Sequence, residues 1–315
     1  MGDCIPVNNR KAGLIMVFAM LIVGFIDNYI VVIAETASLW QFQIIRAGLA
    51  LPILIIISAF GMGRLRPVRW WAVYFRSFLT ALSMLFYFGS LAFVPFSDAL
   101  AGLFTAPIFV LLISAFFLRQ AIGPIRVIAV FIGFLGILLV LGNTAEEFNY
   151  ISLLPAIGGF FYACGSIATR QLCMGETTLS MLAALLVIQA FIGFVAIFCL
   201  STFGFDAPLG ADGFILRTWV WEMSPFIWWV VLQAVGATVG VGLIFRAYQI
   251  GDASYVSIYE YSVFIFGPSF AWLLMDQPIA TLQLLGILCI TFAGVMIALR
   301  SGSTSLRKYV YNSKL

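Results

Sequence analysis

The sequence predicts an all-α membrane protein with ten transmembrane helices arranged as two inverted five-helix repeats. Three observations lead to this fold class. Of the 315 residues, 63% are hydrophobic and 9% are charged, which is more apolar surface than a soluble protein of this size buries. Uncharged runs of about 20 residues recur along the chain, and this length crosses a hydrocarbon layer about 30 Å thick. A block of about 50 residues occurs twice, which is typical of secondary transporters.

The first five uncharged runs are bounded by polar or turn-forming residues. Residues 11–33 follow a short polar tail, and residues 38–58 lead into a loop with three arginines. The run 71–93 begins beside a tryptophan pair of the kind found at membrane interfaces, and a polar turn separates it from 99–118. The run 124–142 opens with a proline, which a helix tolerates in its first turn. Each run is therefore predicted to be one transmembrane helix.

The second five runs follow the same pattern. Residues 151–172 contain a glycine pair that allows a neighbouring backbone to approach closely, and 178–202 is uniformly apolar. The remaining runs are 226–249, 254–275 and 279–299. A long connection precedes the first of these three, and its mixture of tryptophans and polar residues leaves a short interfacial helix and an irregular loop equally open.

The repeated block comprises residues 93–140 and 247–297. Both copies carry an Asp-Ala turn, an apolar span with a proline, a polar turn and a glycine-punctuated apolar span. Five runs separate the copies, so the second copy enters the membrane from the opposite side. The predicted units are a cytoplasmic tail (1–10), a first repeat (11–142), a second, inverted repeat (143–299) and a basic cytoplasmic tail (300–315).

The distribution of Lys and Arg predicts the orientation. With a cytoplasmic N-terminus, nearly all basic loop residues face the cytoplasm, and Arg217 is the exception in an outer loop. We therefore expect an integral protein of a bacterial inner (plasma) membrane with both termini cytoplasmic. The net charge of +3 follows from this bias and requires no nucleic-acid partner.

Charged residues inside the runs are the first candidates for function. Five of them are singled out, namely Asp27, Arg46, Arg76, Arg246 and Glu260. Each costs about 2.5–3.5 kcal/mol at a helix centre, so each is expected to have a partner or a role. At about 1.5 Å per residue, Asp27 can meet Arg46 in the outer half of the membrane and Arg76 can meet Glu260 in the inner half. Such pairs could also serve only to fix the helix register, and Arg246 is near enough to a helix end to reach the interface.

Aromatic residues are predicted to form the walls of a cavity between these charges, where they could stack on a flat or cationic ligand. With the charged residues other than Arg246, they make the expected substrate-binding set: Asp27, Arg46, Arg76, Tyr87, Phe104, Tyr162, Tyr259, Glu260 and Tyr261. Simple packing is the alternative role for each aromatic side chain. The expected hinges are Pro107, Gly267 and Pro268, because a proline within a span removes a backbone hydrogen bond and kinks the helix.

These residues resemble the drug/metabolite transporter superfamily in its EamA-domain branch. The likeness is carried by Arg46 and by the stretches RSFLTALSMLFYFGSLAFVPFSDALAGLFTAPIF, FYACGSIATRQL and AYQIGDASYVSIYEYSVFIFGPSFAWLLMDQPI. It implies two five-helix repeats and a substrate site near the midplane. The third and fourth spans are most similar to the subgroup of S-adenosylmethionine and riboflavin carriers. The chain departs from the family at Arg119-Gln120, where a Gly-Glu pair is frequent.

The expected function is alternating-access transport of a small organic metabolite that is amphipathic, aromatic, cationic or zwitterionic, such as a nucleoside-like cofactor or an amino-acid derivative. A membrane-embedded transferase and a channel are the alternatives. The chain has no histidine, and its five cysteines lack metal-ligand spacing, so no catalytic residue, metal or cofactor is predicted. The sequence also has no segment that resembles the selectivity filter of a channel. The expected partners are the substrate and the lipid bilayer, and the expected state is a monomer, with a dimer left open.

Overall fold

The computed structural model describes residues 8–90, 93, 96–120, 122–141, 153–275, 281–282 and 284–296. Across these residues the chain is helical and contains no strand, which confirms the predicted all-α class. Helices cover at least part of all ten predicted runs. The predicted tails lie outside the described residues, apart from the end of the first.

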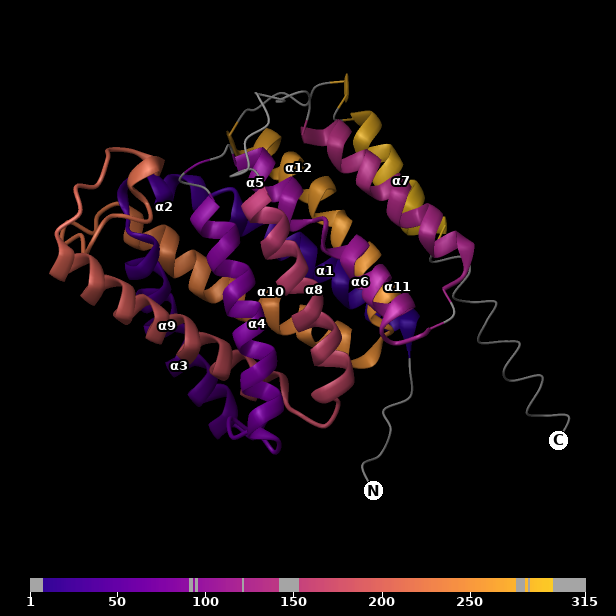
Figure 1. The fold of residues 1–315 in the computed structure, drawn as a ribbon, viewed down its shortest axis with the longest axis horizontal. Coiled ribbons are helices and arrows are strands. Elements are labelled where there is room, and N and C mark those ends of the chain that lie inside the picture. Colours follow the sequence, from indigo (N-terminus) through magenta and orange to yellow (C-terminus); the bar gives the residue numbers. More distant parts are fainter. Residues whose placement is uncertain are drawn as a thin grey trace, which may run out of the picture.

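The helices lie side by side in one bundle (Figure 1). Their bounds are α1 (Asn9–Asp27), α2 (Ile30–Thr36), α3 (Leu39–Ala59), α4 (Trp70–Ser90), α5 (Phe96–Leu103), α6 (Ala106–Phe116), α7 (Pro124–Leu141), α8 (Leu154–Leu172), α9 (Thr178–Phe203), η2 (Ala211–Gly213), α10 (Phe226–Ile250), α11 (Ala253–Val256), η3 (Ser257–Ser262) and α12 (Val263–Met275). A further helix spans Leu284–Met296.

Five stretches are long and apolar enough to cross a membrane. They are Asn9–Thr36, Leu39–Ala59, Trp70–Ser90, Thr178–Phe203 and Phe226–Ile250. The first of these stretches contains a break at 28–29, between α1 and α2, and two other predicted runs are also interrupted. Residues 99–118 contain α5 and α6 with a turn at 104–105, and residues 254–275 contain α11, the 3-10 helix η3 and α12.

Local sequence signals explain several helix ends. Asn8 caps α1, because its Oδ1 accepts a hydrogen bond from the Lys11 backbone N–H at 3.0 Å. Thr177 caps α9 through the Ser180 N–H in the same way. Gly204 ends α9 with a φ of +63°, a left-handed conformation that costs glycine little.

The most extensive helix contacts in the bundle are those of α4 with α8, α1 with α10, and α3 with α9. Small residues allow close approach in each. A Cβ added to Gly158 of α8 would lie 3.1 Å from the Ser83 carbonyl oxygen, and one added to Gly193 of α9 would lie 2.8 Å from that of Trp40. Bundles in lipid depend on such contacts, because van der Waals packing replaces the hydrophobic drive between helices.

The long connection before α10 is irregular apart from η2, so of the two open alternatives the structure shows the loop. It is nevertheless firmly attached to the α2–α3 corner. Arg217 Nη1 donates to the carbonyl oxygens of Ala34 (3.0 Å) and Ala37 (2.6 Å). Gln41 exchanges two hydrogen bonds with the Val220 backbone, at 2.8 and 2.9 Å. The loop therefore covers one end of the bundle as part of the folded structure.

Candidate functional site

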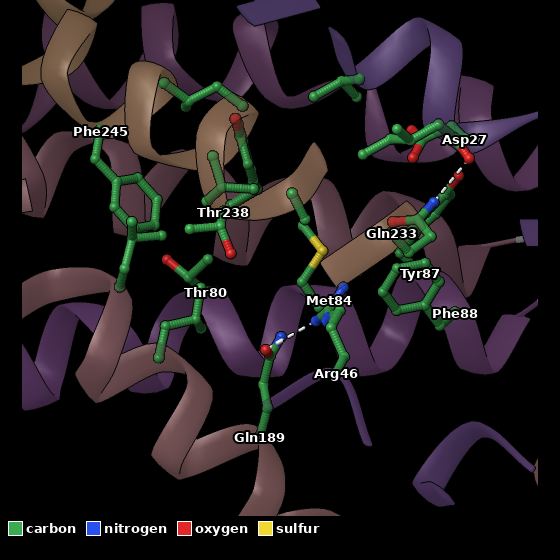
Figure 2. A pocket seen from close by; sticks show the side chains of 18 of the residues that line it. Asp27, Arg46, Thr80, Met84, Tyr87, Phe88, Gln189, Gln233, Thr238 and Phe245 are labelled. Carbon is green, nitrogen blue, oxygen red and sulfur yellow. Dashed lines mark hydrogen bonds between the residues drawn. The ribbon is translucent and has the colours of Figure 1, made fainter. Parts of the chain in front are cut away.

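A cavity of about 120 Å³ lies in the middle of the bundle, between α1, α3, α4, the α5–α6 junction, α8, α9, α10 and η3. Its walls are mainly aliphatic and aromatic. Polar groups enter it from Asp27, Arg46, Thr80, Tyr87, Tyr162, Gln189, Gln233, Thr238 and Glu260. Figure 2 shows many of these side chains converging on the same space. An apolar pocket with a few convergent polar groups is the usual form of a small-molecule site.

The structure brings six of the nine predicted site residues to this cavity. These are Asp27, Arg46, Tyr87, Phe104, Tyr162 and Glu260. The other three, Arg76, Tyr259 and Tyr261, do not line it. Tyr259 packs beside Gly13 of α1, and Tyr261 packs beside Gly133 of α7. Whether the six lining residues bind a substrate stays a prediction.

Arg46 is held by a buried polar network on the α3–α9 side. Its Nη2 donates to Gln43 Oε1 at 2.7 Å. The same nitrogen donates to Gln189 Oε1 at 2.8 Å (Figure 2). Its guanidinium carbon lies 5.0 Å from the centre of the Phe42 ring and 5.8 Å from that of Phe88. Two acceptors and two rings thus fix the guanidinium and compensate part of the cost of its burial.

Glu260 forms a second polar network, on the opposite wall. Its Oε1 accepts hydrogen bonds from Tyr162 at 2.9 Å and Tyr248 at 2.8 Å. Its Oε2 has no partner among the described residues although the side chain is 1% exposed. The 3-10 geometry of η3 breaks the regular helix at this carboxyl group.

Asp27 is the last residue of α1 and enters the cavity beside Gln233 of α10. Gln233 also donates to the Ile26 carbonyl oxygen at 2.8 Å, so this amide holds the end of α1 against α10. Asp27 and Arg46 both line the cavity. In the part of the chain that the structure describes, they form no direct ion pair.

The predicted Arg76–Glu260 pair is wrong. Arg76 Nε donates to Thr169 Oγ1 at 2.8 Å, and its guanidinium carbon lies 3.4 Å from the centre of the Phe245 ring. Among the described residues, Arg76 has no contact with Glu260. The two residues share a depth along their helices, but Arg76 points toward the α8 side and not into the cavity.

Gln189 and Gln233 were not among the site residues predicted from the sequence. Both line the cavity, and both are almost completely buried. An amide carries no charge and therefore a smaller insertion cost, so it stood out less than the five charged residues did. The signal in the sequence that could have identified each glutamine was its position as a polar residue within a predominantly apolar run.

The predicted hinge residues lie at or near the interrupted helices. Pro107 is in the first turn of α6, just after the turn at 104–105, where its missing N–H costs nothing. Gly267 and Pro268 lie inside α12 beside α1, and Asn28 Nδ2 donates to the Gly267 carbonyl oxygen at 3.4 Å. The α5–α6 turn meets α12 where the rings of Phe104 and Phe264 pack edge to face, with their centres 4.9 Å apart.

Comparison with known proteins shows what the chain is similar to. Residues 10–142 match the EamA-like transporter family. A riboflavin transporter of Vibrio cholerae is 26% identical over 188 residues, which cover 59% of this chain and 57% of that protein. A riboflavin transporter of Brucella anthropi is 27% identical over 225 residues, or 71% of this chain and 73% of the relative. These matches confirm the resemblance stated above. A crystal structure with 16% sequence identity has a TM-score of 0.71, covers 94% of this chain and supports the fold.

Proposed function

We propose that the protein carries a small organic metabolite across a bacterial inner membrane by alternating access, because residues 10–142 match the EamA-like transporter family. Its named relatives are transporters and not enzymes. The central observation is the buried cavity, part of whose wall comes from helix breaks: Asp27 lies at the end of α1, Phe104 at the α5–α6 turn and Glu260 in η3. Transporters use such discontinuous helices at their binding sites, because the freed backbone and side chains can line a cavity there.

The packing of the helices supports the inverted repeat. We number the predicted spans one to ten along the chain. In two five-helix repeats, each span of the first half is equivalent to the span five places later, and each span of the second half to the span five places earlier. Exchanging equivalent spans should therefore convert each helix contact into another contact that is also present. The contact between α4 (third) and α8 (sixth) then becomes the contact between α10 (eighth) and α1 (first), and both pairs are present. The α3–α9 pair, second and seventh, is converted into itself. The packing of α5 and α6 on α8 corresponds to that of α11, η3 and α12 on α1. A pseudo-twofold relation between the halves accounts for all of these contacts.

Two equivalent loop attachments support alternating access. On the face expected to be cytoplasmic, Glu176 between α8 and α9 accepts hydrogen bonds from the N–H groups of Val68 (2.9 Å) and Arg69 (2.6 Å), just before α4. We call this contact the inner latch. On the other face, Arg217 and Gln41 join the loop before α10 to the α2–α3 corner, and we call this the outer latch. Exchanging equivalent spans converts one latch into the other. A carrier must open its two faces in turn, so one latch would break in each half of the cycle.

We expect the two latches to control access to the cavity separately. Glu176→Ala removes the acceptor for two N–H groups and should open the cytoplasmic face, whereas Arg217→Ala should open the outer face. The reporter is Thr238→Cys in the cavity wall, in a background without the five native cysteines. A membrane-impermeant maleimide should label it several-fold faster from the cytoplasmic side in the first variant and from the outside in the second.

The control for this experiment is Arg66→Ala, which removes an exposed charge from the loop of the inner latch. It should leave both labelling rates unchanged. If Glu176→Ala and Arg217→Ala label like this control from both sides, the latches do not gate the cavity.

Transport itself is tested with purified protein. Riboflavin is the first cargo to try, because two similar proteins are named as its transporters. A thermal-shift screen against a panel of metabolites widens the search, since a ligand that binds the folded protein raises its melting temperature by mass action. Each ligand found should then enter proteoliposomes faster than it enters protein-free vesicles, with saturation. If no ligand stabilises the protein and none is taken up, the carrier function is wrong.

A further inference from the structure

We propose, on the basis of the carrier function above, that the cavity selects a ligand that carries no negative charge and has two different polar ends. One end is a carbonyl acceptor that binds Arg46 and Gln189, and the other is a hydroxyl or amine donor that binds Glu260. Gln189 is then a specificity residue that reads the acceptor end.

The acceptor end is defined by unused donors. Arg46 and Gln189 are 7% and 3% exposed, yet Arg46 Nε and Gln189 Nε2 have no partner among the described residues. Arginine can only donate, so the bond from Arg46 requires the Gln189 oxygen to face it, and the amide NH₂ must point elsewhere. Both residues line the cavity (Figure 2). Buried donors without partners are costly, and a bound acceptor would remove this cost.

The donor end is defined by an unused acceptor. Tyr162 and Tyr248 both donate to Glu260 Oε1, so the second oxygen is left free while the first is saturated. Glu260 lines the cavity, and no basic side chain is within hydrogen-bonding distance of it in the described chain. A ligand O–H or N–H is the group that Oε2 lacks.

The two ends lie on different walls. Arg46 and Gln189 come from the neighbouring helices α3 and α9, whereas η3, which carries Glu260, packs against α1, α6, α7, α11 and α12. Figure 1 shows α3 and α9 on one flank of the bundle and α11 and α12 away from them. Apolar and aromatic side chains such as Met84, Phe88 and Phe104 make up much of the rest of the cavity wall. The middle of the ligand should therefore be a flat or apolar body.

The charges disfavour an anionic ligand. Arg46 shares the cavity with the acidic residues Asp27 and Glu260. A carboxylate placed at Arg46 would add a third acidic group to a cavity that holds Asp27 and Glu260, and burying an uncompensated charge is strongly unfavourable. A ring or amide carbonyl satisfies the two donors without this penalty.

Two flavins serve as probes. Riboflavin has ring carbonyls at one end and a chain of hydroxyls at the other, and lumiflavin has the same ring without the hydroxyls. Affinity is measured from the quenching of flavin fluorescence on titration with purified protein. Gln189→Leu should weaken both flavins roughly tenfold, since it removes a buried hydrogen bond to the shared ring. Glu260→Gln should weaken riboflavin to a similar degree and leave lumiflavin unchanged within twofold.

Each variant has a matched control. Gln43→Leu removes the other acceptor from Arg46 Nη2, but Gln43 does not line the cavity, so its effect should be clearly smaller than that of Gln189→Leu. Tyr248→Phe removes one hydrogen bond to Glu260 Oε1 from outside the cavity and should affect riboflavin less than Glu260→Gln. Thermal melts establish that all four variants are folded.

Three results would overturn the inference. Equal losses in Gln43→Leu and Gln189→Leu would mean that the glutamines act only by holding Arg46. Equal losses of the two flavins in Glu260→Gln would mean that this carboxyl group does not read the hydroxyl end. If the wild-type protein binds neither flavin but takes up another metabolite, the ligand class is wrong and the carrier function stands; if it takes up nothing, the carrier function fails.

Discussion

Gly159→Val is expected to prevent the protein from folding into a stable bundle. A Cβ added at this position of α8 would lie 2.7 Å from the Leu103 carbonyl oxygen and 2.9 Å from that of Gly102. These are backbone atoms at the α5–α6 turn, so they cannot move aside as a flexible side chain can. Overpacking usually costs about 1–3 kcal/mol, and a clash with backbone lies at the upper end or beyond. The change should lower the melting temperature sharply and produce aggregates on size-exclusion chromatography.

Gly48→Val is the matched control, because nothing lies within 4 Å of the position of a Cβ added to Gly48 in α3. It should purify like the wild-type protein. A Gly159→Val protein that melts within about 2 °C of wild type would show that α8 does not approach the α5–α6 turn as described, since 1 kcal/mol corresponds to roughly 2–4 °C in a domain of 150–250 residues.

Arg46→Lys is expected to reduce transport roughly hundredfold while the protein stays folded. The ammonium keeps the charge but loses the planar group, whose carbon lies 5.0 and 5.8 Å from the centres of the Phe42 and Phe88 rings and which donates to two glutamines. Loss of two charge-assisted hydrogen bonds, each worth about 1.5–3 kcal/mol, is sufficient for this effect. The measurement is the initial rate of uptake into proteoliposomes per reconstituted molecule.

Arg126→Lys is the corresponding control. Arg126 also donates a hydrogen bond, to Ser254 Oγ at 3.0 Å, and lies near a ring, that of Tyr255, but it is outside the cavity. This change should leave uptake within about twofold of wild type. Equal rates in the two lysine variants would mean that Arg46 has only a structural role.

The interrupted helices show where a prediction from the sequence stops. The runs 99–118 and 254–275 are apolar and of the right length, so hydropathy predicts a continuous helix for each. Hydropathy does not report whether backbone hydrogen bonds are broken. The breaks at Phe104 and in η3 occur where the chain lines a cavity, and only the packing of other helices around that cavity makes such a backbone tolerable.

The charged residues show the same limit in the candidate site. Counting residues along a helix gave Arg76 and Glu260 the same depth, but it did not give the rotation of each helix about its axis or its neighbours. Arg76 therefore pairs with Thr169 and Phe245, and Glu260 with two tyrosines. The predicted partner of Arg46 was Asp27, whereas the structure shows Gln189 accepting its hydrogen bond.

The amino-acid sequence by itself determined that the chain is an all-helical protein of apolar helices with few, costly charges inside them, because length and hydropathy are properties of each segment alone. The sequence alone was also enough to recognise the resemblance to a transporter family. The tertiary structure decided which of those charges face a common cavity, which glutamines lie beside them there and where helices are interrupted. Each of these depends on how helices distant in the sequence rotate and pack against one another, and segmental composition carries no information about that.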